Sequence, residues 1–162
     1  GEERHLNAGD FSKSFEIAAA AGLGLTSHAG EICGADSVRD TLDTLKVSRV
    51  GHGVRAIEDD DLVKRLADEQ IVLEVCPGSN ISLNVFSTWD DHPIGKLRDA
   101  GVLVTVSTDD PPYFYTDMTR EYTKLHEVFG WGVADFNAIN QTAMKAAFWD
   151  EATRQGIMKK FE

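Results

Sequence analysis

Short apolar runs alternate along this chain with stretches in which apolar residues recur every three or four positions. The runs are typical of buried strands, and the recurring spacing is typical of helices that bury one face. In residues 35–45, for example, Val38, Leu42 and Leu45 fall on one side of a helix. The pattern predicts strands at 23–27, 48–50, 71–76 and 102–107, and helices at 12–21, 35–45, 58–69, 94–100, 119–129, 133–148 and 151–159.

The order of these elements is strand then helix, repeated four times, with a helical tail at the end. Such an order predicts an α/β fold in which crossover helices connect parallel strands. The strands begin about 25 residues apart, a spacing that suits the short connections of α/β units. That spacing fits an open doubly wound sheet or part of an eight-unit barrel.

All four predicted strands end in polar sequences. These are SHAGE at 27–31, GHG at 51–53, EVCPGSN at 74–80 and STDDP at 107–111. In α/β folds the chemistry lies at the carboxyl ends of the strands. Since turn formation alone does not require two histidines and several acids at four successive ends, we expect these residues to form a functional site.

The residue types at the strand ends suit a metal-dependent hydrolase. His28, His52 and Asp109 offer imidazole and carboxylate ligands of the kind that zinc takes, and Glu31 can move protons. A bound zinc ion makes hydroxide available near neutral pH. Because the candidate ligands follow different strands, the sequence offers no compact local motif for the metal.

The charge of the chain argues against two classes of partner. The formal net charge is −11 over 162 residues, and 42% of the residues are hydrophobic. An acidic surface is not expected to bind nucleic acid or an anionic membrane. No apolar run reaches the ~20 residues of a membrane span, and no signal peptide is evident. With only Cys33 and Cys76, both expected to be free thiols, we expect a cytoplasmic protein.

The strand-end motifs resemble those of the adenosine deaminase family, adenosine and AMP deaminases of the metal-dependent hydrolase superfamily. The matching segments are SHAGE at 27–31, RVGHG at 49–53, VCPGSN at 75–80 and STDDP at 107–111, in the family order. The resemblance implies the C-terminal half, strands five to eight, of a (β/α)8 TIM-type barrel followed by a helical tail. Residues 1–162 would then form the C-terminal part of one barrel domain whose N-terminal half is not in this chain.

The resemblance also implies a role for each matching residue. His28 and Asp109 would be ligands of one zinc ion per complete active site. Glu31 would donate a proton to purine N1, and His52 would orient and help deprotonate the zinc-bound water, which Asp109 also contacts. The Asp110 side chain would hydrogen-bond with purine N7, and the backbone N–H of Gly1 would contact purine N3.

One family feature is missing. The family carries a His-x-His pair on its first strand, and the five histidines of this chain lie far apart. A whole barrel takes about 250 residues. We therefore expect the chain to need the missing N-terminal half of the barrel, and to be inactive and a poor zinc binder when isolated.

Three functions remain open from the sequence. The first is zinc-dependent deamination of adenosine to inosine and ammonia, a step of purine salvage. The second is deamination of adenine or a modified purine by the same chemistry, and the third is a non-catalytic open α/β module that binds nucleotides. Outside the proposed site, we expect Ser79 and Asn80 to shape their loop, and we expect His5, His92 and His126 to be solvated or to make local contacts.

Overall fold

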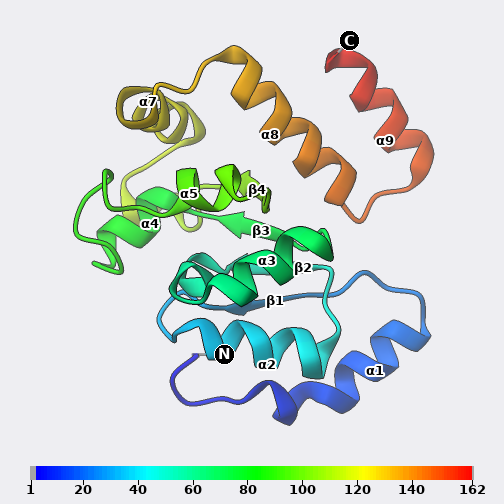
Figure 1. Cartoon of the computed structure of the whole chain (residues 1–162). Coiled ribbons are helices and arrows are strands. Elements are labelled where there is room, and N and C mark those ends of the chain that lie inside the picture. The colour runs from blue at the N-terminus through cyan, green and yellow to red at the C-terminus, as the bar shows by residue number, and fades with distance from the viewer. Residues whose placement is uncertain (1–2, 162) are drawn as a thin grey trace. The chain divides into compact units, whose positions relative to one another are not determined.

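The computed structural model describes residues 3–161, which divide into two compact units (Figure 1). The first unit comprises residues 3–75 and 93–103, and the second comprises residues 76–92 and 104–161. Within residues 3–161, no helix has both the length and the apolar character that a bilayer crossing requires.

Strands and helices alternate in the first unit, as the sequence pattern predicts. Helix α2 places Val38, Leu42 and Leu45 in the core and ends at Lys46, whose φ of +54° breaks the helical repeat. Asp59 begins α3 by accepting a hydrogen bond from the Leu62 N–H over 3.1 Å. The elements are η1 (Ala8–Phe11), α1 (Ser12–Ala20), β1 (Thr26–Ala29), α2 (Ala35–Leu45), β2 (Arg49–His52), η2 (Val54–Glu58), α3 (Asp60–Asp68), β3 (Val72–Val75) and α5 (Ile94–Asp99).

The strands form one sheet in chain order, β1-β2-β3-β4, where β4 is Leu103–Val106. Strand β1 pairs with β2 in parallel, and β2 pairs with β3 in parallel. Helix α2 packs on β1 and η2. The fully buried core of the first unit is aliphatic and comes from both strands and helices: Val38, Val50, Val54, Leu62, Leu66, Leu73, Val75, Ile94 and Leu97.

The second unit is mostly helical. Helix α7 (Met118–Phe129) follows the N-cap residue Asp117, whose side chain accepts a hydrogen bond from the Arg120 N–H. Its C-cap is Gly130, in the left-handed conformation. Leu125 and Ile139 are buried in this unit, and Tyr122 stacks on Phe136 with ring centroids 4.4 Å apart. Its helices are α4 (Pro77–Ser82), α6 (Pro111–Phe114), α7 (Met118–Phe129), α8 (Val133–Ala146), α9 (Glu151–Met158) and η3 (Lys159–Phe161).

The largest difference from the predicted elements concerns the first strand. The sequence predicts a strand at 23–27 with His28 after it, whereas β1 runs from Thr26 to Ala29 and contains His28. Leu23 is exposed, and the strand ladder starts where Thr26 pairs with Arg49. The apolar run therefore leads into the strand, and the strand itself carries the polar residues.

Candidate functional site

His28 and His52 lie side by side at the carboxyl ends of neighbouring strands. In the parallel register, His28 pairs with Gly51 and Ala29 pairs with His52. The two imidazole ring centroids are 5.1 Å apart, with the ring planes at 55°. A Cβ atom at Gly51 would lie 3.1 Å from the His28 ring, so the glycine leaves room for that ring. Two imidazoles that are distant in the sequence thus meet at one sheet edge.

Glu31 joins this pair from the loop that follows β1. Its Oε1 atom lies 3.4 Å from Nδ1 of His52. The His52 side chain is almost fully buried and that of Glu31 is largely buried. A carboxylate at this distance favours one orientation of the imidazole ring. His28, Glu31 and His52, all predicted from the sequence, are therefore brought together within the first unit.

His52 and Asp109 share an uncommon backbone conformation. Their φ angles are +61° and +57°, in the left-handed region that residues other than glycine seldom occupy. Lys46 and Tyr115, which also have positive φ, occupy helix C-caps, where this conformation is common. His52 ends a strand and Asp109 follows one, so no helix end accounts for their conformation. Strain of this kind concentrates at functional sites.

In the second unit, Asp109 is held by a serine. Ser79, in α4, donates its hydroxyl hydrogen to Oδ2 of Asp109 over 2.7 Å. Asp110, the next residue, is the N-cap of α6, but its side chain makes no capping hydrogen bond and is exposed. The Asp110 carboxylate therefore does not cap the N-terminus of α6. From the sequence we expect Ser79 to shape its loop. Its contact with Asp109 leaves no local signal in the sequence, because 30 residues separate the two.

Two buried polar side chains, Glu121 and His92, contact residues of α4. Near its start, the Gly78 N–H donates to Oε2 of Glu121 over 3.0 Å, and burial raises the pKa of Glu121. Further along, His92 Nε2 lies 3.1 Å from Oδ1 of Asn80, and burial lowers the pKa of His92 to about 3. The expectation that His92 is solvated is wrong, because only 2% of it is exposed. Its ring contacts Phe86 and Asn80, which lie within 12 positions of it in the sequence.

A second polar cluster lies on the strands of the first unit. Thr26 donates its hydroxyl hydrogen to Oε2 of Glu74 over 2.8 Å, and Arg49 Nε lies 3.3 Å from Oε1 of the same carboxylate. These contacts join β1, β2 and β3 through side chains. Polar side chains on the strands themselves thus hold the three strands together.

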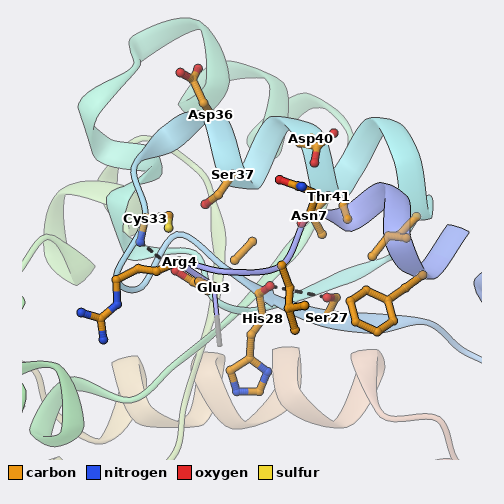
Figure 2. A pocket seen from close by; sticks show the side chains of 15 residues that line it. Glu3, Arg4, Asn7, Ser27, His28, Cys33, Asp36, Ser37, Asp40 and Thr41 are labelled. Carbon is orange, nitrogen blue, oxygen red and sulfur yellow. Dashed lines mark hydrogen bonds between the residues drawn. The ribbon is translucent and has the colours of Figure 1, made fainter. Parts of the chain in front are cut away.

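A cavity of about 540 Å³ opens in the first unit next to His28 (Figure 2). It is bounded by the segment that contains Glu3, Asn7 and Phe11, and by residues of β1 and α2. Figure 2 shows the His28 side chain projecting away from the face on which α2 lies. His28 thus lines the cavity, but its imidazole points away from the wall that α2 forms.

Each unit contains residues of a type that zinc takes as ligands. In the first unit, His28 and His52 offer nitrogen atoms at one sheet edge. In the second unit, Asp109 offers a carboxylate held by a hydrogen bond. These are the ligand types of catalytic zinc sites, in which outer partners commonly orient the ligands. Of the predicted site residues, Gly1 lies outside the described residues.

Comparison with known proteins gives a consistent result. The family model for adenosine deaminase matches residues 1–162. An adenine deaminase of Rhizobium rhizogenes is 56% identical over 160 residues, which is 99% of this chain and 50% of the relative. The crystal structure of an adenine deaminase from Arthrobacter aurescens matches with a TM-score of 0.94 and 32% identity, over 99% of this chain and 49% of that one.

A third match contains a metal. An amidohydrolase from Burkholderia ambifaria, solved with bound zinc, matches with a TM-score of 0.83 and 28% identity over 93% of this chain and 43% of that one. The chain spans about half the length of the relatives it matches. The predicted fold class is confirmed: the chain has a parallel α/β fold that matches part of a TIM-barrel amidohydrolase and continues into a helical tail.

Proposed function

Because this chain belongs to the adenosine deaminase family, we propose that the whole protein that contains it is a hydrolytic purine deaminase, with adenine as its substrate. The reaction takes adenine and water to hypoxanthine and ammonia. The single observation that carries the proposal is the meeting of His28, Glu31 and His52 at the carboxyl ends of β1 and β2. A base, an acid and a nitrogen ligand are the groups that such a reaction needs.

We propose adenine rather than adenosine as the substrate because of the names of similar proteins. The sequence alone favoured adenosine and kept adenine as the alternative. Two relatives that are 56% identical to this chain, from Rhizobium rhizogenes and Rhizobium leguminosarum, are named adenine deaminases. Both purines present the same C6 amino group, so the chemistry of His28, Glu31 and His52 serves either. No comparable observation supports the open nucleotide-binding module.

The residues divide the chemistry as follows in this proposal. Glu31 donates a proton to purine N1, which makes C6 electrophilic. His52 accepts a proton from the attacking water and passes it to the C6 amino group, so that the C6–N bond breaks and ammonia leaves. The hydroxyl group now on C6 loses its proton to the Glu31 carboxylate, which restores the acid and gives the C6 carbonyl of hypoxanthine. The Asp110 side chain hydrogen-bonds with purine N7, and the N–H of Gly1 contacts purine N3.

His28 and Asp109 would hold a zinc ion in the whole protein. When bound, zinc lowers the pKa of water and so supplies a nucleophile near neutral pH. We propose that the remaining metal ligands come from the N-terminal half of the barrel, of which residues 1–162 form the C-terminal part. On this basis the chain alone should be inactive and should bind zinc poorly. A cytoplasmic location stays a prediction from the sequence.

The test is a comparison of substrates and one variant in the whole protein. We expect kcat/KM for adenine to exceed that for adenosine. Glu31→Gln should lower kcat about 10²–10⁴-fold and leave the metal content unchanged, because it removes the proton donor and no ligand. Glu127→Gln is the matched control, since Glu127 is an exposed glutamate paired with Lys124.

A different result would overturn each part of the proposal. Faster turnover of adenosine would overturn the choice of substrate. An unchanged kcat in Glu31→Gln would remove Glu31 as the proton donor. Full activity after complete removal of metal would overturn the metal-dependent reaction as a whole.

A further inference from the structure

The carboxylate of Glu3 binds three successive backbone N–H groups of the loop after β1. Oε1 accepts from the Glu31 N–H over 3.1 Å. Oε2 accepts from the Ile32 and Cys33 N–H groups, both over 2.8 Å. Figure 2 draws the contact with Cys33 as a dashed line. One side chain near the start of the chain thus engages a loop about 30 residues further on.

Three neighbouring N–H groups that point to one place form an anion-binding concavity. In this loop the anion is an internal carboxylate. Hydrogen bonds to a charged acceptor are shorter and stronger than those between neutral groups. Glu3 therefore fixes the path of the backbone at Glu31, Ile32 and Cys33 more firmly than a neutral side chain would.

The other contacts of the loop act at different atoms. Ser37 accepts from the Gly30 N–H over 2.9 Å and donates to the Gly34 carbonyl oxygen over 2.8 Å. The Arg55 guanidinium donates to the Ile32 carbonyl oxygen. These contacts hold the two ends and the outer side of the loop. Glu3 acts on the N–H of Glu31 itself, the residue whose side chain lies 3.4 Å from His52.

We propose that Glu3 is a positioning residue for Glu31. By holding the N–H groups of residues 31–33, it keeps the Glu31 carboxyl at the place from which it reaches both His52 and the purine. This inference rests on the proposed function, because it takes Glu31 as the proton donor. In the proposed function both Gly1 and Glu31 contact the purine. Because Glu3 follows Gly1 by two residues, its hydrogen bonds connect the segment of Gly1 with the loop of Glu31.

The first test is Glu3→Gln in the whole protein, with adenine as substrate. A carboxamide is neutral and has one acceptor oxygen, so it cannot satisfy three N–H groups as the carboxylate does. We expect kcat to fall about 10–100-fold, because displacement of a catalytic group by about 1 Å has effects of this size. KM should change less than about threefold, since Glu31 acts mainly in the transition state.

Asp10→Asn is the matched control. Asp10 also accepts a backbone N–H, that of Asn7 over 3.1 Å, and it lies in the same segment without contact to residues 31–33. Its kcat should stay within about twofold of the parent protein. Hydrogen exchange at the amides of residues 31–33 should be faster in Glu3→Gln than in Asp10→Asn, which is a readout independent of activity.

A double variant separates positioning from a general structural role. If Glu3 acts through Glu31, adding Glu3→Gln to Glu31→Gln should cause no further loss of kcat. If the double variant instead loses kcat further, by the same factor as Glu3→Gln alone, then Glu3 acts elsewhere and the inference is overturned. A normal kcat for Glu3→Gln beside a strongly reduced kcat for Glu31→Gln would also overturn it.

The two proposals fail in different ways. If Glu31→Gln keeps full activity, the assigned proton donor fails, whatever Glu3 does. If Glu3→Gln does not fold, Glu3→Asp replaces it, because aspartate keeps the charge but is one methylene shorter. Glu3→Asp should show a smaller loss of kcat with the same faster exchange at residues 31–33, and unchanged exchange there would overturn the inference.

Discussion

Ser79 donates its hydroxyl hydrogen to Oδ2 of Asp109 over 2.7 Å. The bond connects helix α4 with the residue that follows β4, and both residues belong to the second unit. A hydrogen bond of this kind orients a carboxylate, which matters where that carboxylate is proposed as a metal ligand. Outer partners of metal ligands typically change affinity 10–100-fold when removed.

We therefore expect Ser79→Ala to weaken zinc binding by the whole protein about 10–100-fold. Zinc titration against a competing chelator measures this. The matched control is Ser82→Ala, because Ser82 lies in the same helix and donates to the Gly78 carbonyl oxygen over 2.8 Å. An equal effect of both substitutions would mean that the loss comes from α4 as a whole and not from the contact with Asp109.

The second prediction concerns the contact between Gly78 and Glu121. A Cβ atom at Gly78 would lie 2.2 Å from Oε1 of Glu121, and that carboxylate is also bound by the Thr116 hydroxyl over 2.5 Å. Glu121 is fully buried and cannot swing into solvent. Gly78→Ala should therefore lower the free energy of unfolding by about 1–3 kcal/mol, as overpacking does.

Gly156→Ala is the control for this prediction. Gly156 lies within α9, and nothing lies within 4 Å of a Cβ atom placed there. Replacing glycine by alanine inside a helix stabilises it by about 0.5–1 kcal/mol. Denaturant unfolding of the whole protein with each substitution should give changes of opposite sign. A neutral Gly78→Ala would show that the Glu121 carboxylate can shift at little cost.

Local pattern predicted the helices well where one face is apolar. Helix 35–45 has the predicted bounds, because Val38, Leu42 and Leu45 form a continuous stripe that the core buries. The sequence predicts a strand that stops before Pro77, and β3 does end at Val75, but the pattern missed the helix that begins at Pro77. Pro77 is the first residue of α4, a position at which proline's missing N–H has no cost. A six-residue helix such as α4 has too few apolar positions to show a period.

The candidate site was predicted by residue type, and its supporting contacts were not. His28, Glu31 and His52 were selected because unusual residues end successive strands, and the first unit brings them together. Glu3 gave no signal, because a glutamate in a polar segment matches no period and its partners are backbone N–H groups about 30 residues away. Contacts of this kind depend on the loop's backbone path, which composition does not encode.

The third prediction is a loss of stability in acid that depends on His92. Burial lowers the pKa of His92 from 6.5 to about 3, so the folded protein keeps this imidazole neutral. Below pH 6.5 the unfolded chain takes up a proton that folded His92 does not. The stabilisation is therefore complete above pH 6.5 and decreases as the pH falls toward 3, by up to about 1.4 kcal/mol per pH unit.

His92→Gln should make this dependence shallower. The variant keeps an amide that can donate to Oδ1 of Asn80, but it cannot take up a proton. Denaturant unfolding at a series of pH values between 6.5 and 4 measures the slope for both proteins. The same slope in the two proteins would show that other groups cause the loss of stability in acid.

The fourth prediction separates the metal ligand from the proton donor in the whole protein. His28→Ala removes an imidazole that lies 5.1 Å, centroid to centroid, from that of His52, and it should lower zinc affinity at least about tenfold. Glu31→Gln should leave zinc affinity unchanged while kcat falls. His126→Gln is the control, because His126 contacts the Trp131 carbonyl oxygen in the second unit, with Nδ1 at 2.8 Å.

This prediction is tested by two measurements on the same samples: the zinc content, by elemental analysis, and kcat. Treatment with a chelator should abolish the activity of the parent protein, and added zinc should restore it, because in the proposed reaction a bound zinc ion would lower the pKa of the attacking water. His28→Ala should regain activity only at a higher zinc concentration. If His28→Ala instead binds zinc as tightly as the parent protein and loses kcat alone, then His28 acts on the substrate and the ligand set must lie elsewhere.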